Sequence, residues 1–123
     1  MPERTLADAF SDAADGVASA IKGQPNFRIQ LAMGAGAVVL AALLHFGVFQ
    51  WIILSLIIGF VLAAELVNTC LEHVVDLIMP DSHPLARSAK HAGAGAVLLV
   101  SITAAVTGAI LYAQALREWL AAR

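Results

Sequence analysis

Residues 29–64 read IQLAMGAGAVVLAALLHFGVFQWIILSLIIGFVLAA, a stretch without Asp, Glu, Lys or Arg. As one helix it would be roughly 54 Å long at about 1.5 Å per residue, whereas the hydrocarbon core of a bilayer is about 30 Å thick. The stretch is therefore predicted to cross a membrane twice, with one turn between the crossings. We place this turn at 45–51, where Gly47 and Gln50 interrupt the apolar run and where the aromatic residues typical of a membrane interface gather: Phe46, Phe49 and Trp51.

The composition of the whole chain supports a membrane protein and excludes other classes. Of its 123 residues, 60% are hydrophobic and 13% are charged, whereas soluble domains average about 25% charged residues. The formal net charge of -2 leaves no basic surface for a nucleic acid. Cys70 is the single cysteine, which excludes an intrachain disulfide framework. A chain of this length forms one domain.

Helical periodicity and hydropathy divide the chain into four segments. Apolar residues recur at intervals of three and four across 5–22, which predicts an amphipathic helix on the membrane surface. We predict a first span at 29–48, a second span with a cytoplasmic extension at 51–75, and a third span at 86–116. The predicted fold class is an all-α integral membrane protein with three transmembrane helices and an N-terminal amphipathic surface helix.

The distribution of Lys and Arg predicts how these spans are oriented. One side of the predicted membrane has Arg4, Lys22, Arg28, Arg87 and Lys90, and the other side has Arg117 and Arg123. Because cytoplasmic segments carry the excess of positive charge, the N-terminus and the 77–90 loop are predicted to be cytoplasmic. Small residues in the spans, such as Gly34 and Gly93, favour close helix packing and assembly into an oligomer.

A polar stripe occupies the cytoplasmic end of the second span. It consists of Glu65, Asn68, Glu72 and Asp76, whose intervals of 3, 4 and 4 residues place the last three within roughly 60° of Glu65 around a helix. Ionisable groups within a membrane helix are costly and are functional by default. The stripe therefore predicts a site for a cation, or for a phosphate group that a cation accompanies.

Lys90 and His91 begin the third span on the same side of the membrane as the stripe. One interpretation of Lys90 is an interfacial lysine that balances the nearby charge. The alternative is a site with both signs of charge, in which carboxylates hold Mg²⁺ and the lysine neutralises a phosphate. The chain has no G-x-x-x-x-G-K-[ST] loop, and His73 and His83 lack a partner at zinc spacing.

Two segments together resemble the prokaryotic diacylglycerol kinase family, which includes the undecaprenol kinases. The first is Glu65-x-x-Asn68-Thr69-x-x-Glu72-x-x-x-Asp76, and the second is Ala89-Lys90-His91 with the small-residue helix after it. Upstream, Phe10-x-x-Ala13-x-x-Gly16 and Asn26-Phe27-Arg28-Ile29 are also similar to the family. The resemblance implies a homotrimer in the bacterial inner membrane. It also implies phosphorylation of a lipid alcohol, either diacylglycerol or undecaprenol, by ATP with Mg²⁺ as cofactor.

The resemblance also implies roles for individual residues. Glu65 is expected to be the catalytic base and Glu72 the metal ligand. Asn68 is expected to hold substrate or nucleotide, and Lys90 to contact phosphate. The full set expected to bind substrate or nucleotide is Gln24, Arg28, Asn68, Lys90 and His91.

Two positions depart from the family pattern. Gln24 stands where the family usually has a second metal-binding acid, and His91 stands where it has Asp. Two other functions therefore remain open: a non-enzymatic homologue that binds nucleotide, metal or lipid, and a small proton or cation carrier. The carrier is disfavoured because a stripe confined to one edge of the membrane offers no path across it.

Overall fold

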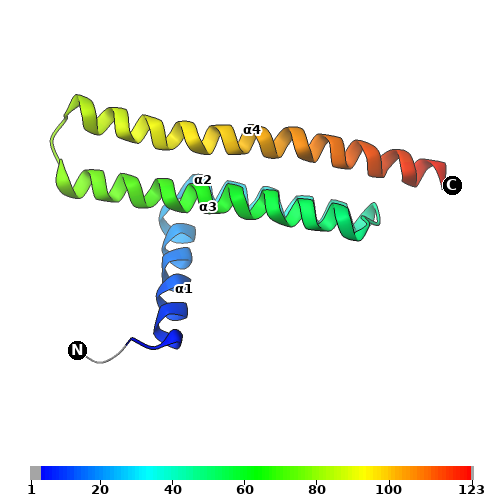
Figure 1. The fold of residues 1–123 in the computed structure, drawn as a ribbon, viewed down its shortest axis with the longest axis horizontal. Coiled ribbons are helices and arrows are strands. Elements are labelled where there is room, and N and C mark those ends of the chain that lie inside the picture. Colours follow the sequence, from blue (N-terminus) through cyan, green and yellow to red (C-terminus); the bar gives the residue numbers. More distant parts are fainter. Residues whose placement is uncertain (1–3, 123) are drawn as a thin grey trace.

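The computed structural model describes residues 4–122. Arg123, which is predicted to lie on the side of the membrane opposite the cytoplasm, is not among them. These residues form four helices: α1 (Leu6–Gly23), α2 (Pro25–Leu43), α3 (Val48–Ile78) and α4 (Pro84–Ala121). Helices α3 and α4 form a long hairpin, α2 packs against α3, and α1 projects away from the other three (Figure 1). The prediction of an all-helical fold is confirmed.

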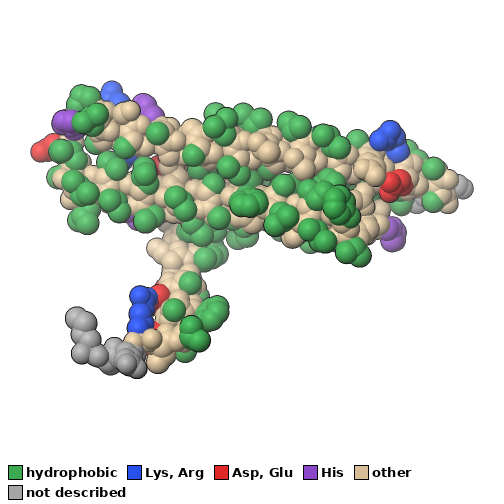
Figure 2. All heavy atoms as spheres, viewed as in Figure 1, with side chains coloured by type: hydrophobic (Ala, Val, Ile, Leu, Met, Phe, Trp, Pro, Cys, Tyr) green, Lys and Arg blue, Asp and Glu red, His purple; other side chains and the backbone are tan. Residues whose placement is uncertain are grey.

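Helices α2, α3 and α4 are each long and apolar enough to cross a membrane. In the most apolar window of each, at most 17% of the residues are buried, so most of their apolar side chains face outward. Figure 2 shows Lys, Arg, Asp and Glu side chains on α1 and at the two ends of the bundle, with hydrophobic side chains along its length. This arrangement agrees with the three predicted spans.

Helix α1 begins with a capping box. The Thr5 hydroxyl accepts from the Asp8 backbone N–H, and the Asp8 carboxylate accepts from the Thr5 backbone N–H at 2.9 Å. The hydrogen bonds from the backbone and then from the hydroxyl of Thr5 lower the pKa of Asp8. The capping therefore favours the ionised carboxylate, and its contribution is lost as the pH falls through that lowered value.

A single residue joins α1 to α2. Gln24 is extended, with φ -113° and ψ 105°, and Pro25 occupies the first turn of α2, where a fixed φ and a missing N–H are well tolerated. Helix α2 therefore starts four residues before the expected span at 29–48. The chain changes direction at Gln24, which lets α1 run across the axis of the bundle (Figure 1).

The turn between α2 and α3 is shorter than the predicted 45–51. His45 has a φ of 55°, and the N–H groups of His45 and Phe46 donate to the carbonyls of Ala42 and Ala41, which is a Schellman ending of α2. Helix α3 then starts at Val48, because the Gln50 side chain accepts from the Gly47 N–H at 2.7 Å.

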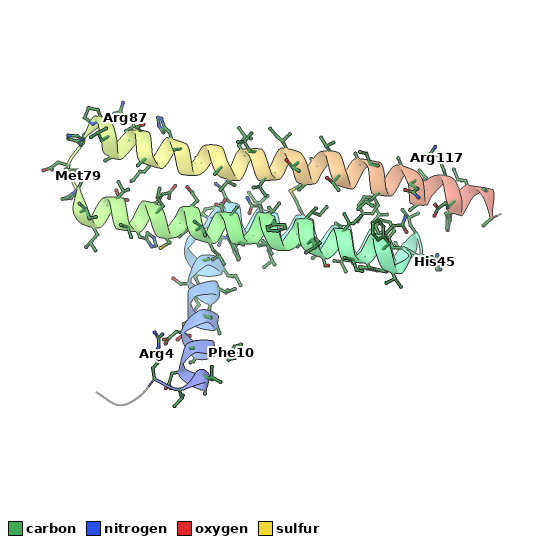
Figure 3. The ribbon with its side chains drawn as sticks, in the orientation of Figure 1. Arg4, Phe10, His45, Met79, Arg87 and Arg117 are labelled. Carbon is green, nitrogen blue, oxygen red and sulfur yellow. The ribbon has the colours of Figure 1, made fainter. Side chains whose placement is uncertain are left out.

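The apolar core lies at the end of the bundle that contains this turn, which Figure 3 marks with His45 and Arg117. Its buried members are Ala41, Phe46, Leu54, Leu111 and Ala115. The Phe46 ring lies 4.9 Å from the ring of Tyr112, whose hydroxyl donates to the Ala37 carbonyl at 2.6 Å. This hydrogen bond links α4 to α2. The polar stripe of α3 thus occupies the half of the bundle away from the core.

Candidate active site

Glu65 lies in the middle part of α3 and is 4% exposed, although it is a carboxylate on an apolar helix. Its Oε2 accepts a hydrogen bond of 3.2 Å from Nε2 of Gln30, which comes from α2. A buried carboxylate on a membrane helix requires such a partner. The contact therefore ties the first span to the polar stripe.

Asn68 is one helical turn further along α3 and is 9% exposed. Its Nδ2 donates to Oε1 of Glu72 at 3.0 Å, which confirms that these two residues share one face of the helix. Its Oδ1 is buried without a hydrogen-bond partner among the described residues and faces Gly93 of α4. A Cβ at position 93 would overlap that oxygen, so any larger residue there requires the Asn68 side chain to shift.

We expect Gly93→Ala to displace the Asn68 side chain, because the new methyl group would overlap its Oδ1 and also approach Leu71 at 3.2 Å. Overpacking of this kind costs about 1–3 kcal/mol. Thermal unfolding in detergent and ATP-dependent lipid phosphorylation measure the two effects. The matched control is Gly95→Ala, since an added Cβ at Gly95 meets no atom within 4 Å. Equal behaviour of the two variants would contradict the proposed packing.

Asp76 and Lys90 connect the outer end of the stripe to α4. Lys90 Nζ lies 2.5 Å from Asp76 Oδ1, with the lysine side chain 35% exposed. Such a partly exposed ion pair contributes little to stability, but it holds the ammonium group on the side of α4 that faces the stripe. Lys90 is thus placed beside the carboxylates, while its predicted contact with phosphate remains a prediction.

The depth of each stripe residue follows from the pairing of α2 with α3. Gln30 lies five residues after Pro25, so Glu65 lies about 7.5 Å inside the level at which α2 begins. Glu72 is seven residues further along α3, which places it about 3 Å beyond that level, and Asp76 lies about 9 Å beyond it. The stripe therefore runs from inside the level at which α2 begins to well beyond it, toward the α3–α4 loop.

Three other predicted site residues remain: Gln24, Arg28 and His91. The hydrogen bond that the structure records for Glu65 is with Gln30 and not with any of them. Gln24 is partly buried and lines a groove of 720 Å³ between α1 and α3. The polar side chains of this groove also include Ser19, Thr69 and His73. Arg28 and His91 are exposed. The hydrogen bond that the structure records for Glu72 is with Asn68 and with none of these three residues.

The donors present fit a magnesium ion only in part. Within residues 4–122, no group of three or more His, Cys, Asp or Glu side chains could hold a metal ion. Mg²⁺ in nucleotide enzymes, however, is usually bound by one or two carboxylates together with phosphate oxygens and water. Glu72 is half-buried, and Asn68 occupies one of its roughly four acceptor positions. Glu72 therefore fits the role of a single protein ligand to a metal–nucleotide complex.

Sequence reasoning did not identify Gln30 as a site residue. The signal was present, because Gln30 is one of few polar side chains in the uncharged stretch at 29–64. Its significance depends on the register between α2 and α3, which brings it to Glu65. Asp76 was included in the stripe, but its pairing with Lys90 comes from the α3–α4 hairpin.

A buried glutamate on a spanning helix, followed by a carboxylate, an ion-paired lysine and water, is the kind of site expected of a membrane-bound phosphotransferase. Residues 11–112 match the family model described as prokaryotic diacylglycerol kinase. The chain therefore belongs to the prokaryotic diacylglycerol kinase family and is a multi-pass membrane protein. The predicted resemblance is confirmed, and so is the prediction of a lipid kinase at the level of the family.

Three curated relatives are similar to this chain. The undecaprenol kinase of Bacillus subtilis is 33% identical over 104 residues, which cover 85% of each protein. The diacylglycerol kinase of Synechocystis sp. is 42% identical over 104 residues, covering 84% of this chain and 59% of the relative. The diacylglycerol kinase of Sinorhizobium sp. is 27% identical over 94 residues, covering 76% of this chain and 69% of the relative.

Proposed function

We propose that this protein transfers the γ-phosphate of ATP to the hydroxyl group of a membrane lipid alcohol, either diacylglycerol or undecaprenol. The observation that carries the proposal is the depth of the polar stripe. Glu65 lies about 7.5 Å inside the level at which α2 begins, the side from which a lipid would approach, whereas Glu72 and Asp76 lie beyond that level, the side from which ATP would approach.

In the proposed mechanism, Glu65 accepts the proton of the lipid hydroxyl as the hydroxyl oxygen attacks the γ-phosphorus of ATP. The bond between the γ-phosphorus and the β–γ bridging oxygen breaks, and ADP leaves. Lys90, held by Asp76, neutralises charge on the transferred phosphoryl group. Asn68 fixes the orientation of the Glu72 carboxylate through their hydrogen bond. When bound at Glu72, Mg²⁺ would supply further charge neutralisation on the phosphates. The chain's own task is to position two substrates that arrive from different phases.

The nucleotide is proposed to approach along the groove between α1 and α3. This groove carries Gln24 and several hydroxyl or imidazole side chains, and its α3 residues belong to the same stretch of helix as Asn68, Glu72 and Asp76. Arg28 is exposed near the same joint and can contact phosphate. His91 is exposed at the start of α4 and is assigned to the same nucleotide side.

The same proposal includes a homotrimer. Two observations support it. A single chain provides one carboxylate, Glu72, that fits as a Mg²⁺ ligand, and most residues of its spans are not buried. Adjacent copies would cover small-residue and apolar helix faces and would bring further polar groups to the site. Chemical crosslinking in native membranes tests the assembly, and an exclusively monomeric active protein would exclude it.

Incubation of the purified protein with labelled ATP and separate diacylglycerol, undecaprenol and ceramide samples tests the activity. We expect incorporation of label into diacylglycerol or undecaprenol that requires Mg²⁺. Nucleotide binding without incorporation into any lipid would instead support the non-enzymatic homologue, for which Gln24 and His91 are the motivating departures.

The orientation of the chain is also a prediction. With Cys70 replaced by Ser, a cysteine at Ser82 in the α3–α4 loop is expected to be protected from an impermeant thiol reagent in intact cells. A cysteine at Ala121 near the end of α4 is expected to react, because the charge bias places that end outside. Labelling at position 82 from outside would reverse the proposed orientation.

A further inference from the structure

Gln30 makes a contact that crosses from one membrane span to another. Its Nε2 donates to Oε2 of Glu65 at 3.2 Å, and the two residues are 35 positions apart in the chain. Glu65 is 4% exposed, so that this amide is part of the immediate surroundings of a nearly inaccessible carboxylate. The roles derived above for the stripe residues do not use Gln30.

The chemistry of the pair fixes which end of the amide faces the carboxylate. An ionised carboxylate only accepts hydrogen bonds, so the Gln30 amide must present its NH₂ group to Glu65. Its oxygen then points elsewhere, and Gln30 Oε1 is buried without a partner among the described residues. A buried unpaired acceptor costs free energy. An apolar residue would avoid that cost, so packing alone does not account for an amide at this position.

We propose that Gln30 is a positioning residue for the catalytic base. By holding Oε2 of Glu65, the Gln30 amide fixes the rotation of the carboxylate and leaves Oε1 of Glu65 to accept the proton of the lipid hydroxyl. A hydrogen bond to a charged group is stronger and more directional than one between neutral groups. This inference rests on the proposed function, because it assigns Gln30 a role only if Glu65 acts as a base.

The first test compares Gln30→Met, which removes the donor but keeps the length of the side chain, with Met33→Leu on the same helix. We expect Gln30→Met to lower kcat by about 10- to 100-fold, since misplacing a catalytic group by about 1 Å has effects of this size. The KM values for lipid and for ATP are expected to change by less than about twofold. The Tm in detergent is expected to fall, because the buried Glu65 carboxylate loses its hydrogen-bond partner.

Gln30→His supplies the matching rescue, because an imidazole N–H can replace the lost donor. We expect the decrease in log kcat for this variant to be at most about half of the decrease for Gln30→Met. A merely structural role for Gln30 would instead weaken MgATP binding and raise the KM values along with the fall in kcat, and Gln30→His would not restore kcat.

A double-mutant cycle separates positioning of the base from every other effect. In a Glu65→Gln background, Gln30→Met is expected to cause no further loss of kcat beyond about twofold, since the group that Gln30 positions has gone. A full additive loss would overturn the inference, as would an undiminished kcat for Gln30→Met alone. If the wild-type protein phosphorylates no lipid, the proposed function fails. If it is active and depends on Glu65 but not on Gln30, only the inference about Gln30 fails.

Discussion

Glu65→Gln is expected to lower the rate of lipid phosphorylation by about a hundredfold or more while the protein remains folded. The substitution preserves the shape of the side chain but removes the group that accepts the hydroxyl proton, and general-base catalysis contributes effects of this size. The amide oxygen of the new Gln can still accept from Gln30 Nε2. Because a buried carboxylate in a membrane helix costs roughly 1–3 kcal/mol, stability is expected to be retained or increased.

The measurements are kinase rate, MgATP binding and Tm in detergent, all on the same preparation. The matched control is Glu118→Gln, which makes the same substitution at an exposed position near the other end of α4. A lost rate with retained binding and stability supports a catalytic role. Loss of nucleotide binding and Tm in step with activity would make Glu65 structural and would remove the mechanism proposed above.

The membrane fold could be predicted from sequence because only apolar segments with few charges are stable in the hydrocarbon core. The uncharged stretch at 29–64 is too long for one crossing and therefore requires a turn. The position of the turn was less accurate, since it depends on the backbone of His45 and on the Gln50 cap of α3. The start of α2 at Pro25 likewise reflects local backbone chemistry, which hydropathy does not measure.

The polar stripe was predictable because helical periodicity fixes which residues share a face. Intervals of 3, 4 and 4 placed Asn68 beside Glu72, and their hydrogen bond confirms it. Gln30 was not predictable in this way, because its contact with Glu65 depends on how α2 and α3 pack. The glycine at position 93 belongs to the same category: it was interpreted as helix packing, whereas its specific partner is the Asn68 side chain.

The structure of a single chain explains only part of why Gln24 and His91 depart from the family pattern. Gln24 lines the α1–α3 groove, where a neutral amide could contact nucleotide but would bind Mg²⁺ more weakly than an acid. His91 is exposed and follows Lys90 directly, so it can contact phosphate when protonated. Under the proposed function, metal binding would then depend chiefly on the one retained acid, Glu72.

Glu72→Gln is accordingly expected to raise the Mg²⁺ concentration needed for half-maximal activity and to lower turnover by at least about tenfold. That loss corresponds to about 1.4 kcal/mol of barrier. The new side chain can still accept from Asn68 Nδ2, so the local geometry is retained while the negative charge is lost. The measurement is a Mg²⁺ titration of lipid phosphorylation at saturating ATP. Asp81→Asn in the exposed α3–α4 loop is the control for loss of a nearby charge.

The metal-ligand role of Glu72 and the base role of Glu65 predict different responses to added Mg²⁺. A weakened metal site is refilled by mass action, so high Mg²⁺ is expected to restore part of the activity of Glu72→Gln. A missing proton acceptor cannot be replaced by the cation, so the same titration is expected to leave the low rate of Glu65→Gln unchanged. Wild-type Mg²⁺ dependence with full turnover in Glu72→Gln would place the metal elsewhere. Equal rescue of both variants would contradict the division of roles along the stripe.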